Sequence, residues 1–175
     1  MAGEFRSRRL KTLPGLALRP TPDRLREALF NVLAPRIAGA VFLDAYAGAG
    51  SVGIEALSRG AAHAVFVEKN SAAAKVIEQN LASLGIQDRS TVVRRPSLAA
   101  LGQFEADIYF LDPPYAAPAE YNAALTLLGE RTLRPEALVL AQHAKRFQLA
   151  DSFGRLRRVR VLAHGDNAIS FFAVS

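Results

Sequence analysis

Short apolar segments that alternate with helical segments constrain the fold of this chain more than any other feature of its sequence. The apolar segments predict five strands, at residues 41–43, 64–67, 91–93, 108–111 and 138–141. The periodicity between them predicts helices at residues 52–58, 72–84 and 121–128. Because a strand that is apolar along its whole length is buried on both faces, this alternation predicts a parallel sheet covered by helices on each side.

The last part of the chain has a different pattern. Residues 159–162 and 169–174 are strand-like, and the sequence Gly165-Asp166-Asn167 between them favours a tight turn. We therefore expect an antiparallel hairpin at the edge of the sheet. The predicted fold class is α/β, with a doubly wound, mostly parallel sheet and a C-terminal antiparallel hairpin.

A helix is expected to precede the first strand. Thr21 can cap its N-terminus, Pro22 suits its first helical position, and Asp23 favours the positive end of the helix dipole. Apolar residues follow at helical spacing, and Pro35 and Gly39 are expected to close the helix.

The length of 175 residues fits one domain, and a hydrophobic content of 50% is enough for a full core. No apolar run approaches the roughly 20 residues that cross a bilayer, and the N-terminus has no apolar signal block. The absence of cysteine excludes disulfides and thiolate zinc sites, and the three histidines have no metal-ligand spacing. We expect a cytoplasmic, monomeric protein without a metal.

Positive charge is concentrated in two stretches of the chain. One comprises Arg6, Arg8, Arg9, Lys11 and Arg19, and the other comprises Arg155, Arg157, Arg158 and Arg160. A net charge of +6 suits a polyanionic partner such as a nucleic acid. Two solvated basic faces that only keep the protein soluble would give the same pattern, so charge alone leaves both interpretations open.

The loop after the first predicted strand is rich in glycine. In doubly wound folds ligands bind beyond the carboxyl ends of the strands, where this loop lies. Gly48, Gly50 and Gly53 satisfy the G-x-G-x-x-G pattern of dinucleotide-binding proteins, and Glu68 at the end of the second strand could bind a ribose. A nicotinamide enzyme is therefore one interpretation of this loop.

The carboxylate of Asp44 argues against a dinucleotide. Asp44 ends the first strand, where it would repel a pyrophosphate placed at the following helix N-terminus. S-adenosylmethionine carries an ammonium and a sulfonium and has no phosphate, so the same carboxylate would favour it. The glycines would let the backbone pass close to its methionine portion, and Glu68 could accept both ribose hydroxyls.

The sequence Asp112-Pro113-Pro114-Tyr115 follows the fourth predicted strand. Two prolines fix the backbone and leave carbonyl oxygens free to accept hydrogen bonds. The Asp112 carboxylate and the Pro113 carbonyl could hold both N–H groups of an exocyclic amine, which favours the pyramidal geometry that frees its lone pair. Tyr115 could stack on a base turned out of its helix. Asp112 could take the proton that the amine releases after it receives a methyl group.

Over nearly its whole length the chain resembles the bacterial 16S rRNA guanine-N2 methyltransferases of the RsmD type. The Asp-Pro-Pro-Tyr motif is shared with many DNA adenine methyltransferases. Two other segments are more specific to the rRNA group, Arg19-Pro20-Thr21-Pro22-Asp23-Arg24 and Glu55-Ala56-Leu57-Ser58-Arg59-Gly60-Ala61. The resemblance also covers Arg8-Arg9-Leu10, Phe30-Asn31, Phe66-Val67-Glu68 and Asn80-Leu81.

The resemblance implies a Rossmann-like class I methyltransferase sheet of seven strands, with S-adenosylmethionine as cofactor and 16S rRNA, or the assembling small ribosomal subunit, as partner. It implies a basic RNA-binding arm at residues 1–20 and a methyltransferase domain at residues 21–175. The expected catalytic residues are Asp112, Pro113, Pro114 and Tyr115, and the expected RNA-binding residues are Arg6, Arg8, Arg9, Lys11 and Arg19. The expected cofactor-binding residues are Asp44, Tyr46, Gly48, Gly50, Glu68, Lys69, Ser97, Leu98 and Asp112.

The chain departs from the family pattern at two positions. Pro96 stands where an acidic residue commonly reaches the adenine amino group, so adenine recognition would pass to Ser97 or to the backbone near Leu98. Ala49 stands where serine or threonine is common. Two further hypotheses remain beside the rRNA enzyme: a DNA adenine-N6 methyltransferase, and an RNA-binding assembly factor that has lost turnover.

Overall fold

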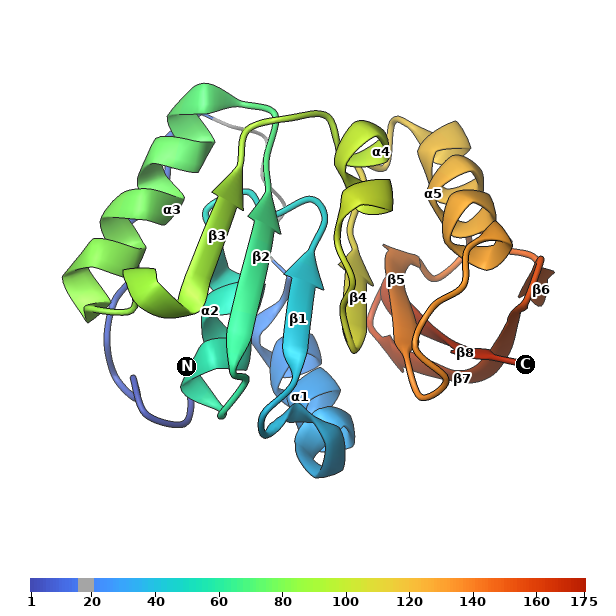
Figure 1. The fold of residues 1–175 in the computed structure, drawn as a ribbon, viewed down its shortest axis with the longest axis horizontal. Coiled ribbons are helices and arrows are strands. Elements are labelled where there is room, and N and C mark those ends of the chain that lie inside the picture. The colour runs from blue at the N-terminus through green and yellow to red at the C-terminus, as the bar shows by residue number, and fades with distance from the viewer. Residues whose placement is uncertain (16–20) are drawn as a thin grey trace.

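The computed structural model describes residues 1–15 and 21–175, which form a layered α/β structure (Figure 1). The strands are β1 (Val41–Asp44), β2 (His63–Val67), β3 (Ser90–Val93), β4 (Ile108–Leu111), β5 (Leu138–Ala144), β6 (Ser152–Phe153), β7 (Leu156–His164) and β8 (Asn167–Val174). The α-helices are α1 (Asp23–Ile37), α2 (Ser51–Ser58), α3 (Ser71–Leu84), α4 (Ser97–Ala100) and α5 (Pro118–Glu130). Short 3-10 turns lie at Gln87–Arg89 and Leu101–Gln103.

The strands of the described residues form one sheet in the order β3-β2-β1-β4-β5-β8-β7-β6. The first five strands in this order pair in parallel, and β8 and β7 continue the sheet as an antiparallel hairpin. The predicted doubly wound fold class and the C-terminal hairpin are therefore confirmed. The expected count of seven strands is wrong, because β6 adds an eighth. This strand has two residues, which is too short for a periodic signal in the sequence.

Apolar side chains fill both faces of the sheet. On one face Phe42 and Phe110, from neighbouring strands, stack with ring centroids 6.4 Å apart and pack with α1 and α2. On the other face Tyr109, Val139 and Phe172 pack with α4 and α5. Two-sided burial explains why the inner strands β1, β2 and β4 are apolar at most positions, whereas β3 at the edge is only half-buried.

The start and the end of α1 differ from the prediction. The Thr21 hydroxyl does not cap the helix, because it donates a hydrogen bond to Gln142 Oε1 at 2.9 Å in the buried interior. The helix also continues past Pro35 to Ile37. Pro35 lies in the last turn on an exposed part of the helix, where water can satisfy the carbonyl that loses its N–H partner.

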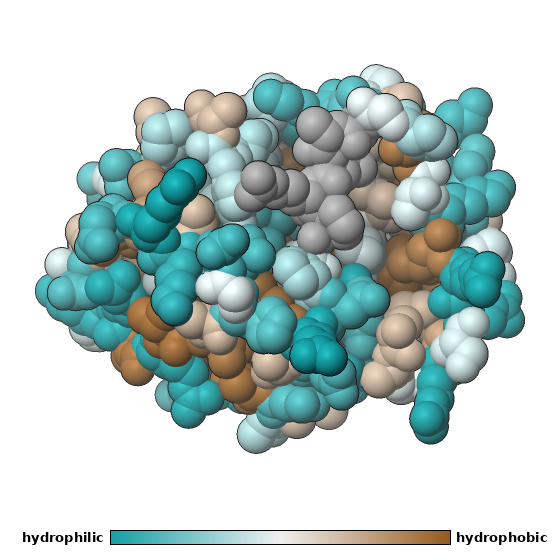
Figure 2. All heavy atoms as spheres, turned by 180° about the vertical axis from the view of Figure 1, so that it is seen from behind, coloured by the Kyte–Doolittle hydropathy of each residue, from teal (hydrophilic) through white to brown (hydrophobic). Residues whose placement is uncertain are grey.

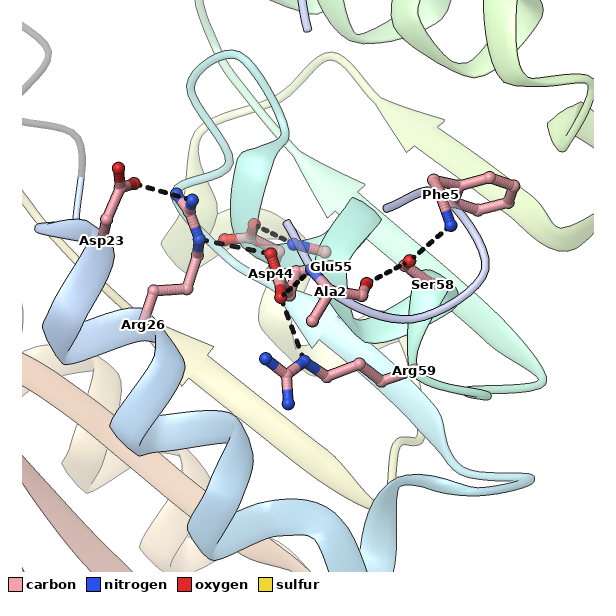
Figure 3. A network of polar contacts seen from close by, with 9 residues as sticks. Ala2, Phe5, Asp23, Arg26, Asp44, Glu55, Ser58 and Arg59 are labelled. Atoms are coloured by element: carbon pink, nitrogen blue, oxygen red, sulfur yellow. Dashed lines mark hydrogen bonds and ion pairs between the residues drawn. The ribbon is translucent and has the colours of Figure 1, made fainter. Parts of the chain in front are cut away.

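The first residues of the chain pack against α2 rather than extend into solvent. Phe5 is buried, and its N–H donates to Ser58 Oγ at 2.9 Å (Figure 3). Buried Glu55 of α2 joins this segment to α1: it accepts from the Ala2 N–H at 3.1 Å and pairs with Arg26 Nε at 3.3 Å. The N-terminal segment is therefore attached to the body at defined points. Its separation as an RNA-binding arm stays a prediction.

Gly129 gives a stability prediction for the C-terminal half. Gly129 lies in α5, and a Cβ built there would be 1.9 Å from the carbonyl oxygen of Phe153 in β6. Glycine-to-alanine exchange inside a helix ordinarily stabilises by about 1 kcal/mol. Here the backbone contact reverses the sign, and we expect Gly129→Ala to lower the free energy of unfolding by at least about 2 kcal/mol in urea titrations.

Thr126→Ala is the matched control, since Thr126 is an exposed position of the same helix. We expect it to leave stability unchanged or slightly raised. If Gly129→Ala were as stable as wild type or more stable, as Thr126→Ala is expected to be, the close packing of β6 on α5 would be contradicted.

Candidate functional site

A cavity of 930 Å³ lies at the carboxyl ends of the parallel strands. The residues expected to bind the cofactor and to perform the chemistry gather around it. Those that line it are Asp44, Tyr46, Gly48, Glu68, Lys69, Ser97, Leu98, Asp112, Pro113, Pro114 and Tyr115. Gly50 is not among its lining residues. It precedes α2 with φ +88°, in the left-handed region that glycine adopts without strain.

The predicted RNA-binding residues divide between this cavity and the surface. Arg8 and Lys11 line the cavity. Arg6 and Arg9 are exposed and are not among its lining residues. Arg19 lies outside the described residues. The side of the molecule opposite that of Figure 1 is largely hydrophilic around smaller apolar areas, as Figure 2 shows.

Strand register explains why three carboxylates meet here. Asp44 of β1 lies beside Phe66 of β2 and Phe110 of β4. Side chains alternate along a strand, so residues two positions beyond these partners point to the same side as Asp44. Glu68 and Asp112 occupy those two positions. The sheet therefore places an acid on each side of Asp44, immediately past its apolar layer.

The glycine loop is held by Glu68. Gly48 N–H donates to Glu68 Oε2 at 2.8 Å, and Asn70 N–H donates to Glu68 Oε1 at 2.9 Å. Each carboxylate oxygen keeps a further lone pair for a ligand hydroxyl. Because the Gly48 N–H already has an acceptor, the loop does not offer this donor to a phosphate.

Burial sets the charge state of the two central acids. The pKa of Asp44 rises to about 7 because burial disfavours its charge, an effect that the Gly53 N–H partly offsets and that the charge of Glu68 increases. The pKa of Asp112 rises well above its usual value, first through burial and then through repulsion from Asp44. Two adjacent carboxyls that cannot both ionise easily create a site that a cation would stabilise.

Tyr46 and Ser97 lie on the side of the cavity formed with α4. The Ser97 hydroxyl donates to the Ala45 carbonyl at 2.5 Å and so keeps lone pairs that can accept from a ligand. Tyr46 Oη is buried without a hydrogen-bond partner among the described residues. Its pKa is raised by burial and by the neighbouring Glu120 carboxylate. A ligand that offers a donor or acceptor here would satisfy this oxygen.

In the Asp112–Tyr115 segment the two proline carbonyls differ. Pro114 accepts from the Ala117 N–H at 2.9 Å, so the expectation that both carbonyls are free is wrong for Pro114. The Tyr121 hydroxyl lies 3.3 Å from the Pro113 carbonyl but 2.8 Å from the Gln142 carbonyl. A hydroxyl has one proton, and the shorter contact holds it, which leaves the Pro113 carbonyl available.

Tyr115 is oriented by the C-terminal hairpin. Its hydroxyl donates to Asn167 Oδ1 at 2.5 Å, at the first residue of β8. The turn between β7 and β8 therefore lies beside the Asp112–Tyr115 segment. Sequence reasoning predicted this hairpin but did not connect it with the site.

Asn80 is a further site residue that sequence reasoning missed. Its side chain is 1% exposed and lies on the inner face of α3. Lys11 N–H donates to Asn80 Oδ1 at 2.7 Å, and Asn80 Nδ2 donates to the carbonyls of Lys11 at 3.1 Å and of Ala49 at 3.2 Å. One amide thus joins the N-terminal segment to the glycine loop. A polar residue within the apolar face of a predicted helix is the signal that could have identified it.

The described residues contain no group of three or more histidine, aspartate or glutamate side chains arranged to hold a metal ion. Within residues 1–15 and 21–175, no helix is long and apolar enough to cross a membrane.

Comparison with known proteins finds a matching family and related structures. The family model described as Conserved hypothetical protein 95 matches residues 1–173. Ribosomal RNA small subunit methyltransferase D of Escherichia coli is 42% identical over 144 residues, which are 81% of this chain and 72% of that protein.

Two solved structures illustrate the likeness of fold. The structure of yhhF from Escherichia coli has a TM-score of 0.88 and 31% identity, covering 99% of this chain and 96% of that one. An RNA methyltransferase from Salinibacter ruber, in complex with S-adenosyl-L-homocysteine, has a TM-score of 0.68 and 17% identity, covering 89% and 93%. These matches confirm the family resemblance and the fold class.

Asp44 gives a prediction for stability against pH. Its folded-state pKa of about 7 lies above the value of 3.8 of an ordinary aspartate, so the folded state holds a proton that the unfolded state lacks between these values. This group therefore lowers stability as pH rises from about 4 to about 7, and the full penalty remains at pH 8. We expect Asp44→Asn to raise the free energy of unfolding at pH 8 by at least about 1 kcal/mol, with little change at pH 4.

Asp107→Asn is the control with the opposite sign. Burial raises the pKa of Asp107, but hydrogen bonds from the Val41 N–H and Arg134 outweigh it and lower the pKa overall. Ionised Asp107 thus stabilises the fold above its unfolded pKa, and its replacement is expected to lower stability at pH 8. Urea titrations at pH 4 and 8 measure both effects. Equal pH dependence of wild type and Asp44→Asn would contradict the buried carboxylate.

Proposed function

The chain belongs to the family described as Conserved hypothetical protein 95, and from that premise we propose that it transfers a methyl group from S-adenosylmethionine to N2 of a guanine in 16S rRNA. The observation that carries this proposal is the cavity in which the acids Asp44 and Asp112 lie together beside the Pro113 carbonyl. The name of the Escherichia coli relative, a methyltransferase of small-subunit ribosomal RNA, supports the substrate class.

The residues present suit S-adenosylmethionine better than a dinucleotide. The cavity is lined by the carboxylates of Asp44, Glu68 and Asp112, which would repel a pyrophosphate and attract a cation. Glu68 occupies the Gly48 N–H that a phosphate would need. When bound, S-adenosylmethionine would supply a methyl group activated by its sulfonium.

Each cofactor-binding residue has a defined part in this proposal. Asp44 would balance the positive charge, and Glu68 would accept from the ribose hydroxyls while it holds the glycine loop. Ser97 would accept from the adenine amino group, because its own proton is given to the Ala45 carbonyl. Lys69 and Leu98 would line the nucleoside end of the cavity beside Glu68 and Ser97.

The target amine would lie between Asp112 and Pro113. The Pro113 carbonyl would accept one N–H, because the Tyr121 hydroxyl proton is held by the Gln142 carbonyl. The Asp112 carboxylate would accept the other N–H, which would direct the nitrogen lone pair toward the methyl group. Asp112 would be ionised beside the positive charge of the cofactor. Once that charge is gone, burial and Asp44 raise the pKa of Asp112, so it would receive the proton released after methyl transfer. In this arrangement catalysis is mainly positioning, which contributes up to roughly 7–11 kcal/mol in favourable cases.

The proposal is tested with radiolabelled S-adenosylmethionine and two substrates, naked 16S rRNA and small-subunit particles. We expect label at guanine N2 in at least one of them. Asp112→Ala should reduce the rate by about 10²–10⁴-fold, because it loses both an acceptor and a base. In a parallel assay with duplex DNA, label on adenine would favour the DNA enzyme, and RNA binding without transfer would favour an assembly factor.

Tyr115 gives a prediction that separates its ring from its hydroxyl. We expect Tyr115→Ala to raise KM for RNA by about 5–150-fold, the equivalent of the roughly 1–3 kcal/mol of one base stacked on an aromatic ring. Tyr115→Phe keeps the ring and loses the hydrogen bond to Asn167, so its KM should rise by less than about fivefold. Steady-state kinetics measure both variants. Equal effects would show that the hydrogen bond, and not stacking, is what the site uses.

A further inference from the structure

Residues Leu10, Lys11, Thr12 and Leu13 separate two hollows. On one side they line the large cavity at the carboxyl ends of the strands. On the other side they line a groove of 620 Å³ against α3, whose remaining lining residues are Ala72, Lys75, Val76 and Gln79. Figure 1 shows this N-terminal segment running along α3 at the edge of the molecule. We call this hollow the arm–α3 groove.

The chemistry of the arm–α3 groove is basic and partly apolar. Lys11 and Lys75 are exposed, and the eight lining residues include no carboxylate. Lys75 has no ion-pair partner among the described residues. Leu10, Leu13 and Val76 are the large apolar residues of its lining. Cations together with apolar side chains match a nucleotide, which has an anionic phosphate and an apolar base face.

The groove is formed before any ligand binds, because hydrogen bonds fix the N-terminal segment to α3 at Lys11. Asn80 holds both the N–H and the carbonyl of Lys11, at 2.7 and 3.1 Å. Arg8 Nη2 donates to the Ser83 carbonyl at 3.1 Å, which fixes the arm one turn further along α3. A preformed wall reduces the ordering cost of binding an extended ligand.

We propose that the arm–α3 groove binds a nucleotide of the RNA substrate that flanks the target guanine. The phosphate would contact Lys11 and Lys75, and the sugar or base would lie on Leu10, Leu13 and Val76. The inference rests on the proposed RNA methyltransferase function. It extends the substrate contact beyond the arginines of the arm to a lysine of α3.

The test compares Lys75→Ala with wild type in binding to transcribed 16S rRNA, measured by filter binding between 50 and 200 mM salt. We expect affinity to fall about 3–10-fold at low salt, and the slope of log K against log salt to decrease in magnitude by about 0.7–0.9. Lys75 does not line the cofactor cavity, so the affinity for S-adenosylmethionine, measured by calorimetry, should stay unchanged.

Arg36→Ala is the control for net charge. Arg36 lies in the last turn of α1 and pairs with Glu136, which precedes β5. Three strands separate β5 from β3, the strand that α3 precedes. The Arg36→Ala variant removes one positive charge, as Lys75→Ala does, and should leave RNA affinity near that of wild type. An equal loss in both variants, or none in Lys75→Ala, would overturn the groove.

A second measurement separates the groove from the proposed function. Ultraviolet crosslinking of wild type to 16S rRNA, followed by peptide mass spectrometry, should mark residues 72–79. Methylated RNA with crosslinks only outside the arm and these residues would overturn the groove and leave the methyltransferase in place. Failure of wild type both to bind and to methylate 16S rRNA would overturn the proposed function, and the groove with it.

Discussion

The buried carboxyl of Asp44 is the constraint on which the site depends. It ends β1 at a position 1% exposed, between Glu68 and Asp112, which directly follow the adjoining strands β2 and β4. Ionisation there is costly without a counter-charge, as its raised pKa shows. The fold accepts an unfavourable group at the centre of its sheet, and a cationic ligand is the natural way to relieve it. The same acids disfavour a phosphate, so one arrangement attracts a cationic ligand and discriminates against a phosphorylated one.

The glycine loop and the arm are fixed to this acidic centre by two polar side chains. Glu68 accepts the Gly48 N–H on one side of the loop, and Asn80 donates to the Ala49 carbonyl on the other. Because Asn80 also holds Lys11, the N-terminal segment and the glycine loop share a single buried amide. If RNA binding shifted the arm, it would change the hydrogen bonding of the loop. The factor by which RNA then changes cofactor affinity would equal the factor by which the cofactor changes RNA affinity.

The parts of the fold that burial determines could be predicted from the sequence. The inner parallel strands are largely apolar on both faces, and the predicted positions of all five parallel strands agree with the structure to within three residues at either end. The failures have local physical causes. β6 consists of two residues that pair with β7 and pack on α5. The Thr21 hydroxyl donates to Gln142 and therefore does not cap α1. The strand β6 is too short to leave a periodic pattern in the sequence, and the partner of Thr21 is 121 positions away.

For the candidate site, residue types and strand order predicted which acids meet, because carboxyl ends of parallel strands share one edge. They did not predict how those acids are already engaged. That Glu68 holds a glycine N–H, that Pro114 loses its free carbonyl to Ala117, and that Asn80 reaches the arm all follow from tertiary distances. Sequence indicates the chemistry that a site can hold, whereas the hydrogen bonds already made decide which of its atoms remain for a ligand. At the centre of this site the Asp112 carboxyl and the Pro113 carbonyl remain as acceptors, which suits a cation and an amine.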